Sequence, residues 1–511
     1  MTSLAVRGLL ILAVVLTGFG IGTAPLAAAA AAGPATASAL NSLRWGADIE
    51  SGAPYSYKDP ADPKKVIGFE AEIAQALAAQ MGLRLQFFQN NWGGLVQGLE
   101  RQDYDIVVNG LEITPERRRE VNFSVPYYVT SETLTVKQEN ASIHELKDLE
   151  HKRVGTLTAS LAQRILTEQS FPMELKTYDQ EVHIYNDLTF DRLDAVLLDD
   201  PIALYYAKPN AALKAVGPPV GRLEYGIATR KADPQFSDAV NAALQTLIAN
   251  GTLRRILERW GLWNELTAQA WGQSVAPQSP DTAYQSYLHS LREQHSWKEH
   301  VARYVSFLPL LARGAGMTLQ ISVLSMILAI AVGLLTALGR LYGPRAVCWV
   351  AVSFVEVFRG TPLLIQLYLI FYGLPHLGLR LDPFMAAVLG LGLNYGAAEA
   401  ENYRAGILSI PKAQMDASQA LGMSWWQSLR HIILPQAIRV VIPPVTNDFI
   451  ALLKDSSLVS VITMVELTST YGQLASTYFD YLGIGLLTAA VYFLIGLPFV
   501  RLSRYFEAKL N

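Results

Sequence analysis

The chain has 511 residues, of which 51% are hydrophobic and 17% are charged, and its formal net charge is −3 at pH 7. The charged fraction lies below the roughly 25% that is usual for soluble domains, and the length favours two or more domains. The small net charge does not favour a nucleic-acid partner. The single cysteine, Cys348, excludes an intramolecular disulfide, and no thiol or histidine cluster indicates a metal site.

Residues 1–37 are predicted to form a signal peptide. Arg7 supplies a positive start, residues 9–16 are apolar, and the small residues of segment 35–37 fit a cleavage site. The alternative is an uncleaved anchor helix over residues 9–30, which is long enough to cross a bilayer. The short, glycine-interrupted apolar core favours cleavage, and both interpretations place the next segment outside the cytoplasm.

Residues 40–265 are predicted to form a soluble α/β domain of two lobes, because strand and helix patterns alternate along them. Strands are expected at 43–48, 83–88, 105–109, 153–157 and 194–198, and helices at 69–81, 91–101, 160–168 and after Pro201. Such alternation is typical of parallel sheets, in which ligands bind beyond the carboxyl ends of the strands. Candidate binding residues are therefore those that follow each strand.

The most specific pattern of this domain follows its third strand. Residues 109–117 read Asn-Gly-Leu-Glu-Ile-Thr-Pro-Glu-Arg, and residues 122–127 read Asn-Phe-Ser-Val-Pro-Tyr. A small-residue turn, Ile-Thr, an arginine and Phe-Ser-x-Pro-Tyr at these spacings resemble the polar-amino-acid solute-binding proteins of ABC importers. The resemblance covers about residues 42–263. It implies a two-lobed, periplasmic-binding-protein-like fold of type II.

The resemblance also implies how a zwitterionic ligand is held. Arg117 would clamp the α-carboxylate, because a guanidinium donates two parallel hydrogen bonds to a carboxylate. Thr158, Ser160 and the Leu161 N–H, at the start of the predicted helix 160–168, would add donors to the same group. For the Ser160 side chain, a plain helix cap is an equally supported interpretation. Asp199 would accept the α-ammonium group.

Further ligand-binding candidates follow from position and residue type. Tyr55 and Trp92 match aromatic residues that sandwich the ligand side chain in relatives, although ordinary core packing is as well supported for Tyr55. The remaining candidates lie just after predicted strands and are Asp48, Asn109, Gly110 and Glu112. Glu112 departs from the family pattern, which commonly has Ser or Thr there.

The charges near the strand ends indicate the class of ligand. Asp48 and Glu50 are acidic, and Arg117 is the basic residue evident near the cleft loops. An acidic ligand would face like charges there. Arginine, lysine, histidine or glutamine is therefore the predicted ligand; the alternative is that Asp48 and Glu50 point into solvent.

Residues 266–304 are interpreted as a connection between two domains. Gly272, Pro277 and Pro280 favour a flexible linker over 266–282. Residues 284–304 mix aromatic and charged side chains, which is typical of an amphipathic helix on the outer membrane surface.

Residues 305–511 are predicted to form an all-α transmembrane permease domain of about five helices. The expected spans are 318–338, 363–379, 384–403, 440–461 and 482–502. Basic residues gather between the first two spans, between the third and fourth, and at the carboxyl end. By the positive-inside rule these segments are cytoplasmic, including the C-terminus. The odd number of spans agrees with a binding domain on the outer side.

The long loop before the fourth span contains Asp416, Ala417, Ser418 and Gly422, followed by Leu434-Pro435. It resembles the EAA loop of ABC-importer permeases, with Asp in place of the usual Glu. Segments 358–364 and 447–457 match the amino-acid branch of that family, and the resemblance covers about residues 312–508. The chain is thus similar to cyanobacterial fusions that transport basic amino acids or glutamine. The resemblance implies a short coupling helix that docks in a cleft of an ATPase.

Several ionisable residues fall inside predicted spans, where charge is costly. They are Glu399, Glu401, Asp448, Lys454 and Asp455. One interpretation is a polar translocation path for the amino acid. An equally supported one is an ion pair between Lys454 and an acid that locks helices together.

The predicted function is ATP-driven uptake of a polar, basic amino acid across the bacterial inner membrane. The sequence contains no phosphate-binding G-x-x-x-x-G-K-[ST] motif, so ATP is expected to be hydrolysed by a separate ABC ATPase subunit. The chain itself is expected to bind no cofactor and to be a transporter subunit, not an enzyme. A homodimer with two ATPase subunits, surrounded by lipid, is expected. The alternative is a ligand-gated ion channel, in which membrane spans would interrupt the binding domain.

Overall fold

The computed structural model describes residues 41–59, 62, 64–292, 297–478 and 480–510. The predicted signal peptide lies outside the described residues.

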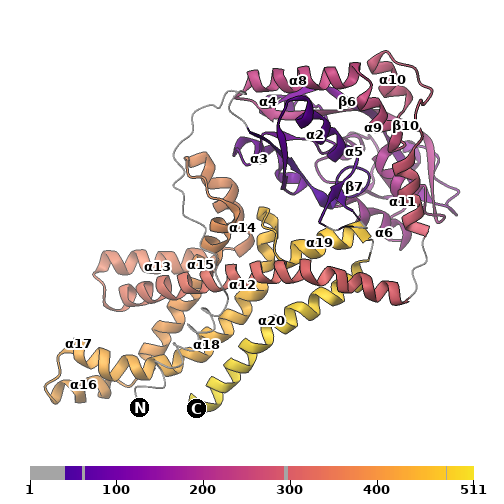
Figure 1. Ribbon diagram of the computed structural model, residues 1–511. Coiled ribbons are helices and arrows are strands. Elements are labelled where there is room, and N and C mark those ends of the chain that lie inside the picture. Colours follow the sequence, from indigo (N-terminus) through magenta and orange to yellow (C-terminus); the bar gives the residue numbers. More distant parts are fainter. Residues whose placement is uncertain (1–40, 60–61, 63, 293–296, 479, 511) are drawn as a thin grey trace. The chain divides into compact units, whose positions relative to one another are not determined.

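The α/β domain is built on one eight-stranded sheet with the order β4-β1-β5-β10-β6-β9-β7-β8 (Figure 1). The strands are β1 Ser42–Ala47, β4 Arg84–Gln89, β5 Ile106–Val107, β6 Val121–Lys137, β7 Arg153–Leu157, β8 Glu174–Tyr178, β9 Ala195–Asp199 and β10 Leu213–Arg230. A separate pair joins β2 Tyr57–Lys58 to β3 Val66–Ile67. The five strands expected from the sequence are all present, with ends shifted by a few residues.

Two long strands correct the prediction of parallel sheets. In the first lobe β4, β1 and β5 are parallel, and in the second lobe β8, β7 and β9 are parallel. Strands β6 and β10 lie between these groups and run antiparallel to each other along most of their length. The aromatic and β-branched side chains of β6 suit its largely buried position, whereas β10 is mostly exposed before Leu223 and buried after it. The two lobes therefore share one sheet, and β6 and β10 connect them.

Helices cover the sheet in both lobes. They are α2 Phe69–Gln80, α3 Leu95–Glu100 after the short 3-10 turn η3 Trp92–Gly94, α5 Leu161–Thr167, α6 Glu181–Thr189, α8 Pro234–Ala249 and α9 Thr252–Arg259. Short helical turns over 200–207 follow β9 and contain Pro201. Phe69, Ile73 and Leu77 lie on one face of α2 and are fully buried. Burying such side chains contributes about 1.5–3 kcal/mol each.

The connection between the domains is more helical than predicted. Helix α10 Glu265–Trp271 replaces the first part of the expected flexible linker. Asn264 caps it, since its side-chain oxygen accepts a hydrogen bond from the Thr267 N–H. The expected interfacial helix 284–304 is divided between α11 Thr282–Arg292 and the start of α12 Trp297–Tyr342.

The remaining residues form a helical domain. Its helices after α12 are α13 Arg345–Gly360, α14 Leu363–Tyr368, α15 Pro383–Leu408, α16 Lys412–Ala420, α17 Trp425–Ser428, α18 Leu434–Asp455, α19 Leu467–Tyr478 and α20 Tyr481–Leu510. Segment 345–360, which the sequence prediction placed between the first two spans, forms helix α13. Its apolar run lies between basic residues and is shorter than a membrane span needs to be, so a prediction based on length does not identify it as a span.

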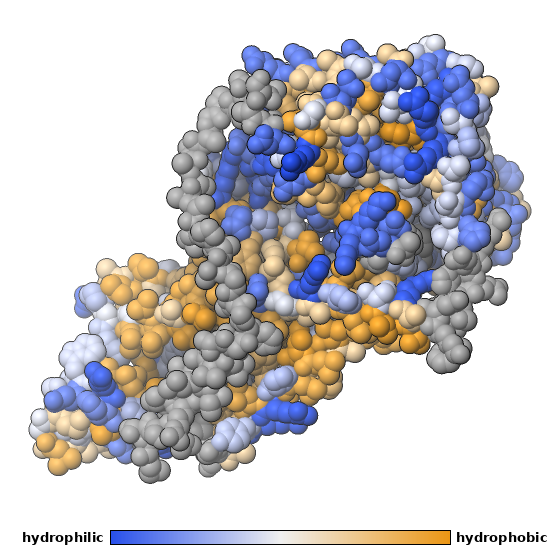
Figure 2. Space-filling view, in the orientation of Figure 1, coloured by the Kyte–Doolittle hydropathy of each residue, from blue (hydrophilic) through white to orange (hydrophobic). Residues whose placement is uncertain are grey.

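Two helical stretches of the described residues, Val301–Tyr342 and Tyr481–Phe506, are long and apolar enough to cross a membrane. The pair Arg345–Gly360 and Leu363–Leu377, bent by 108°, is a third candidate if it forms one span. Figure 2 shows hydrophobic residues gathered on the surface of this helical domain. The exposed apolar side chains of this domain include Leu324, Ile327 and Leu335 of α12 and Leu486 and Phe493 of α20. Helices α15 and α18 carry acidic residues, so five spans remain a prediction.

Candidate ligand-binding site

The predicted site residues of the α/β domain gather at the carboxyl ends of its strands. Asp48 follows β1, Asn109 and Gly110 follow β5, Thr158 and Ser160 follow β7, and Asp199 ends β9. The parallel direction of the strands within each lobe brings these ends to one edge. The structure therefore places side chains from both lobes at a common site.

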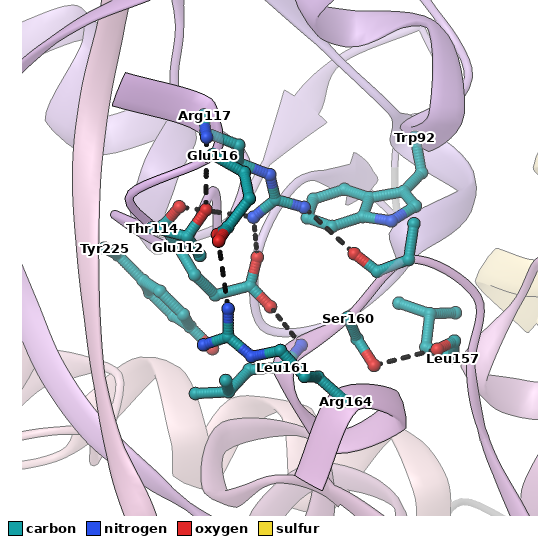
Figure 3. Close-up of polar contacts among 12 residues, drawn as sticks. Trp92, Glu112, Thr114, Glu116, Arg117, Leu157, Ser160, Leu161, Arg164 and Tyr225 are labelled. Atoms are coloured by element: carbon teal, nitrogen blue, oxygen red, sulfur yellow. Dashed lines mark hydrogen bonds and ion pairs between the residues drawn. The ribbon is translucent and has the colours of Figure 1, made fainter. Parts of the chain in front are cut away.

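Arg117 opens the short helix α4 Arg117–Glu120 and forms an ion pair with the Glu112 carboxylate (Figure 3). The same guanidinium nitrogen donates to the Glu112 carbonyl at 3.2 Å, and the other terminal nitrogen donates to the Ala159 carbonyl at 3.0 Å. The second oxygen of the Glu112 carboxylate accepts from the Leu161 N–H at 3.2 Å. Glu112 thus contacts both groups expected to hold a ligand carboxylate, and it is only 3% exposed.

Both hydroxyl groups of the β7–α5 turn bond to the backbone. The Ser160 hydroxyl accepts from the Gln163 N–H at 3.1 Å and donates to the Leu157 carbonyl at 2.8 Å. The Thr158 hydroxyl donates to the Tyr178 carbonyl at 2.9 Å. The structure thus shows Ser160 as a helix cap, the second of the two interpretations of its side chain.

Asp199 lies in a buried group of tyrosines and acids. The Tyr225 hydroxyl donates to its carboxylate, and the Tyr55 hydroxyl lies 3.5 Å from the same oxygen and 3.0 Å from the Tyr225 hydroxyl. Glu132 of β6 is paired in register with Asp199 of β9 and is fully buried. Within the part of the chain that the structure describes, no basic side chain forms an ion pair with either acid.

These surroundings shift the acidity of both groups. Burial, followed by the nearby Glu112 carboxylate, raises the pKa of Asp199 to about 7. Burial and the neighbouring Asp199 carboxyl raise the pKa of Glu132 well above its usual range. Both acids would be stabilised in their charged form by a cation placed beside them.

Asp48, Asn109 and Gly110 shape the first lobe. Asp48 is 5% exposed and accepts from the Gln89 side-chain amide at 2.9 Å and from the Trp92 N–H at 2.8 Å. The alternative that Asp48 points into solvent is therefore wrong. Asn109 accepts from the Asp48 N–H at 2.8 Å. Gly110 has φ +60°, and a Cβ there would lie 3.1 Å from the Tyr55 ring, so glycine suits this close approach.

The aromatic candidates also lie at the site. The Trp92 indole N–H donates to the Thr158 carbonyl at 3.2 Å, which links the two lobes. The Arg117 guanidinium carbon lies 5.4 Å from the centre of the Trp92 ring, within the range of a cation–π interaction. Tyr55 is 4% exposed and packs on Phe69 and Tyr225.

Glu50 does not point freely into solvent either, because it accepts a hydrogen bond from the side chain of Gln180.

Sequence reasoning missed several buried polar residues of this site. They are Glu70, Tyr127, Glu132, Glu181 and Tyr225. Glu70 accepts from the Gly110 N–H at 2.6 Å and from the Tyr127 hydroxyl, and burial raises its pKa to about 8. The sequence feature that could have identified Glu132 as a site residue is its position as a single acid inside a strand pattern.

The predicted coupling loop of the helical domain forms α16 and α17. Asp416 and Ala417 are exposed on α16, whereas Ser418 is buried and donates to the Met415 carbonyl at 2.8 Å. Gly422 follows with φ +87°, a left-handed conformation that favours glycine. The two helices therefore form a tight helix–turn–helix with an exposed outer surface.

The charges of the helical domain pair differently from the prediction. Glu401 forms ion pairs with Arg340 and, at 2.8 Å, with Arg404. Lys454 forms no ion pair among the described residues, so the expected Lys454–acid pair is not found. The other acids contact neutral partners or are buried: Asp448 accepts from Asn402 at 2.8 Å, Asp455 accepts from Tyr395 at 2.7 Å, and Glu399 is fully buried.

Comparison with known proteins assigns both parts of the chain. Residues 43–262 match the bacterial extracellular solute-binding proteins, family 3, and residues 329–511 match the inner membrane component of binding-protein-dependent transport systems. The L-cystine transport system permease protein TcyB of Bacillus subtilis is 40% identical over 40% of this chain and 88% of its own length. The chain belongs to the amino-acid ABC importers.

Two other relatives by sequence, GlnP and TcyJ, agree with the assignment. The glutamine transport system permease protein GlnP of Escherichia coli is 40% identical over 40% of this chain and 94% of its own length. The L-cystine-binding protein TcyJ of E. coli is 32% identical over 40% of this chain and 78% of its length. A solved structure of an ancestral arginine-binding protein bound to arginine has 32% identity and a TM-score of 0.41, covering 43% of this chain and 98% of that one.

These findings confirm the predicted union of a type II binding domain with a helical permease domain in one importer. The relatives give no support to the alternative of a ligand-gated ion channel.

Proposed function

We propose that this importer takes up a basic amino acid, with arginine or lysine preferred over histidine and glutamine. The observation that carries the proposal is the pair of buried acids Asp199 and Glu132, which have no basic partner among the described residues. Arg117 does not compensate them, because it is paired with Glu112. The site therefore has an excess of acidic groups, and a cationic ligand would supply the missing charge.

The names of relatives support the class of ligand. The matched permeases are named for transport of L-cystine, of glutamine and, in the ArtQ protein of Bacillus subtilis at 34% identity, of arginine. This range agrees with an amino-acid substrate and leaves the choice of side chain to the binding site. Asp199 would hold the α-ammonium group, and Glu132 beside it would favour a second positive charge.

A competition experiment tests the ligand class. Purified full-length protein in nanodiscs is incubated with radiolabelled arginine and an excess of each common amino acid. Arginine and lysine should compete most strongly. Glu132→Gln should weaken arginine binding about tenfold or more, the effect of losing one charge-assisted contact of about 1.5–3 kcal/mol. It should leave glutamine binding nearly unchanged. Tightest binding of aspartate or glutamate would overturn the proposal.

We further propose that a separate ABC ATPase drives transport and docks on α16 and α17. The importer family supports such a partner, and the exposed surface of these helices fits one. Leu421 and Trp426, on either side of Gly422, are 85% and 72% exposed. Apolar side chains this exposed are typical of a protein interface. The proposed assembly is a homodimer of this chain with two ATPase subunits, which bind the ATP, while this chain binds no cofactor.

The proposed orientation places the binding domain outside the cytoplasm and α16, α17 and the C-terminus inside, in line with the basic residues near these segments. Reconstitution with the ATPase in liposomes tests this arrangement. Arginine should accumulate only when ATP is present on the side that exposes α16 and α17. ATP-independent ion current would instead support a channel.

A further inference from the structure

The side chain of Glu112 bridges the two lobes at the place expected for the ligand. Glu112 follows β5 in the first lobe, and Leu161 begins α5 in the second. One oxygen of the Glu112 carboxylate pairs with Arg117, and the other accepts from the Leu161 N–H at 3.2 Å. We call the Arg117 guanidinium and the Leu161 N–H the carboxylate site. Figure 3 shows the Glu112 carboxylate between these two donors.

Each oxygen of the Glu112 carboxylate has a donor in this arrangement. Its side chain is only 4% exposed, while that of Arg117 is 16% exposed. A buried carboxylate that keeps both a guanidinium and an N–H donor is in a favourable environment. A second carboxylate cannot take the same donors without displacing the first, and two carboxylates side by side would repel each other.

We propose that Glu112 is an internal competitor for the carboxylate site, and that a ligand α-carboxylate must displace it from Arg117 and Leu161. The inference rests on the proposed amino-acid ligand and adds a determinant of its affinity. Because the site is available only in the fraction of molecules in which Glu112 has moved away, the apparent dissociation constant equals the intrinsic constant divided by that fraction. Glu112 also holds the lobes together through its contact with Leu161.

A neighbouring contact provides a matched control. Glu116 of the first lobe pairs with Arg164 of the second at 3.2 Å. Like Glu112, it is a glutamate that joins the lobes through an ion pair or hydrogen bond. It differs in being exposed, and the described contacts of Glu116 include neither donor of the carboxylate site. Glu116→Gln therefore changes a contact between the lobes without changing the competition.

The test compares arginine with agmatine, which is arginine without its carboxylate. Dissociation constants of both radiolabelled compounds are measured with full-length protein in nanodiscs. Glu112→Thr should tighten arginine binding about tenfold or more, while agmatine binding stays the same or weakens. Glu112→Gln, which keeps the size but removes the charge, should shift arginine binding in the same direction by less, and it serves alone if Glu112→Thr does not fold. Glu116→Gln should leave the ratio of the two constants unchanged.

Two outcomes would overturn the inference: arginine binding that is unchanged or weakened in the folded Glu112 variants, or an equal change for arginine and agmatine. Failure of the proposed function is separate, because the unaltered protein would then prefer an acidic amino acid or fail to bind arginine.

Discussion

Ligand affinity should rise with pH, because Asp199 must be charged to hold an ammonium group. Its carboxyl lies among Glu112, Glu132, Tyr55 and Tyr225, and burial raises its pKa to about 7. A carboxyl with a raised pKa is protonated below that value, so lowering the pH removes the charge that the ligand needs. Binding of the cation should in turn release a proton near neutral pH.

The size of the effect follows from the pKa of Asp199. A carboxyl with a pKa of about 7 is ~3% ionised at about pH 5.5 and ~76% ionised at about pH 7.5. The affinity for arginine should therefore increase ~25-fold over this range, which corresponds to ~1.9 kcal/mol. Above this range the curve should level off. Because Glu132 adjoins Asp199, the observed midpoint belongs to the pair of acids.

Isothermal titration of the full-length protein with arginine, in buffers of different ionisation enthalpy, measures both the affinity and the protons released. Arginine is suitable because its own charges hardly change in this range. Asp199→Asn should bind more weakly and lose most of the pH dependence. An affinity that is constant or falls from about pH 5.5 to about pH 7.5 would refute the assignment of Asp199 to the ammonium group.

Two further substitutions test the roles assigned to single residues. Arg117→Ala should weaken arginine binding by about 3 kcal/mol, since truncating one partner of a buried charge pair typically costs 2–5 kcal/mol. Arg118→Ala, at the exposed neighbouring position, should leave the dissociation constant unchanged. Equal effects of the two substitutions would show that the carboxylate site is misplaced. Trp426→Asp should abolish ATP-driven uptake in liposomes and leave arginine binding intact. The control Phe190→Asp, which makes the same kind of change at an exposed position of the binding domain, should preserve uptake. Normal uptake by Trp426→Asp would exclude this side chain from the ATPase interface.

The local patterns of the sequence predict the parallel strands and offer Ser160 as a helix cap, because these features depend on neighbouring residues. Strand β7 occupies the range expected for it, and Ser160 caps α5 as one interpretation held. Strand β6 was missed because its Phe-Ser-x-Pro-Tyr segment was interpreted for its resemblance to a family and not for its periodicity. Proline inside that segment also disguises a strand.

Contacts between distant residues were beyond sequence reasoning. Arg117 was placed at a carboxylate site, but its partner Glu112 could not be known to fill that site, because the side-chain conformation depends on the folded turn. In the permease domain the acid Glu401 pairs with Arg340, which lies on a different helix. The sequence identifies the charged residues but does not indicate which of them form ion pairs.

The shared sheet has a mechanical consequence for the binding domain. The ladder between β6 and β10 loses its regular register between Val216 and Val220 and again between Val220 and Leu223. A ribbon with fewer consecutive hydrogen bonds resists bending less than an unbroken one, so flexing should concentrate at this level. Val220 is the residue opposite Glu132. Rotation of one lobe against the other would thus pivot beside the buried acid pair, and the angle between the lobes and the polarity around the ligand would change together.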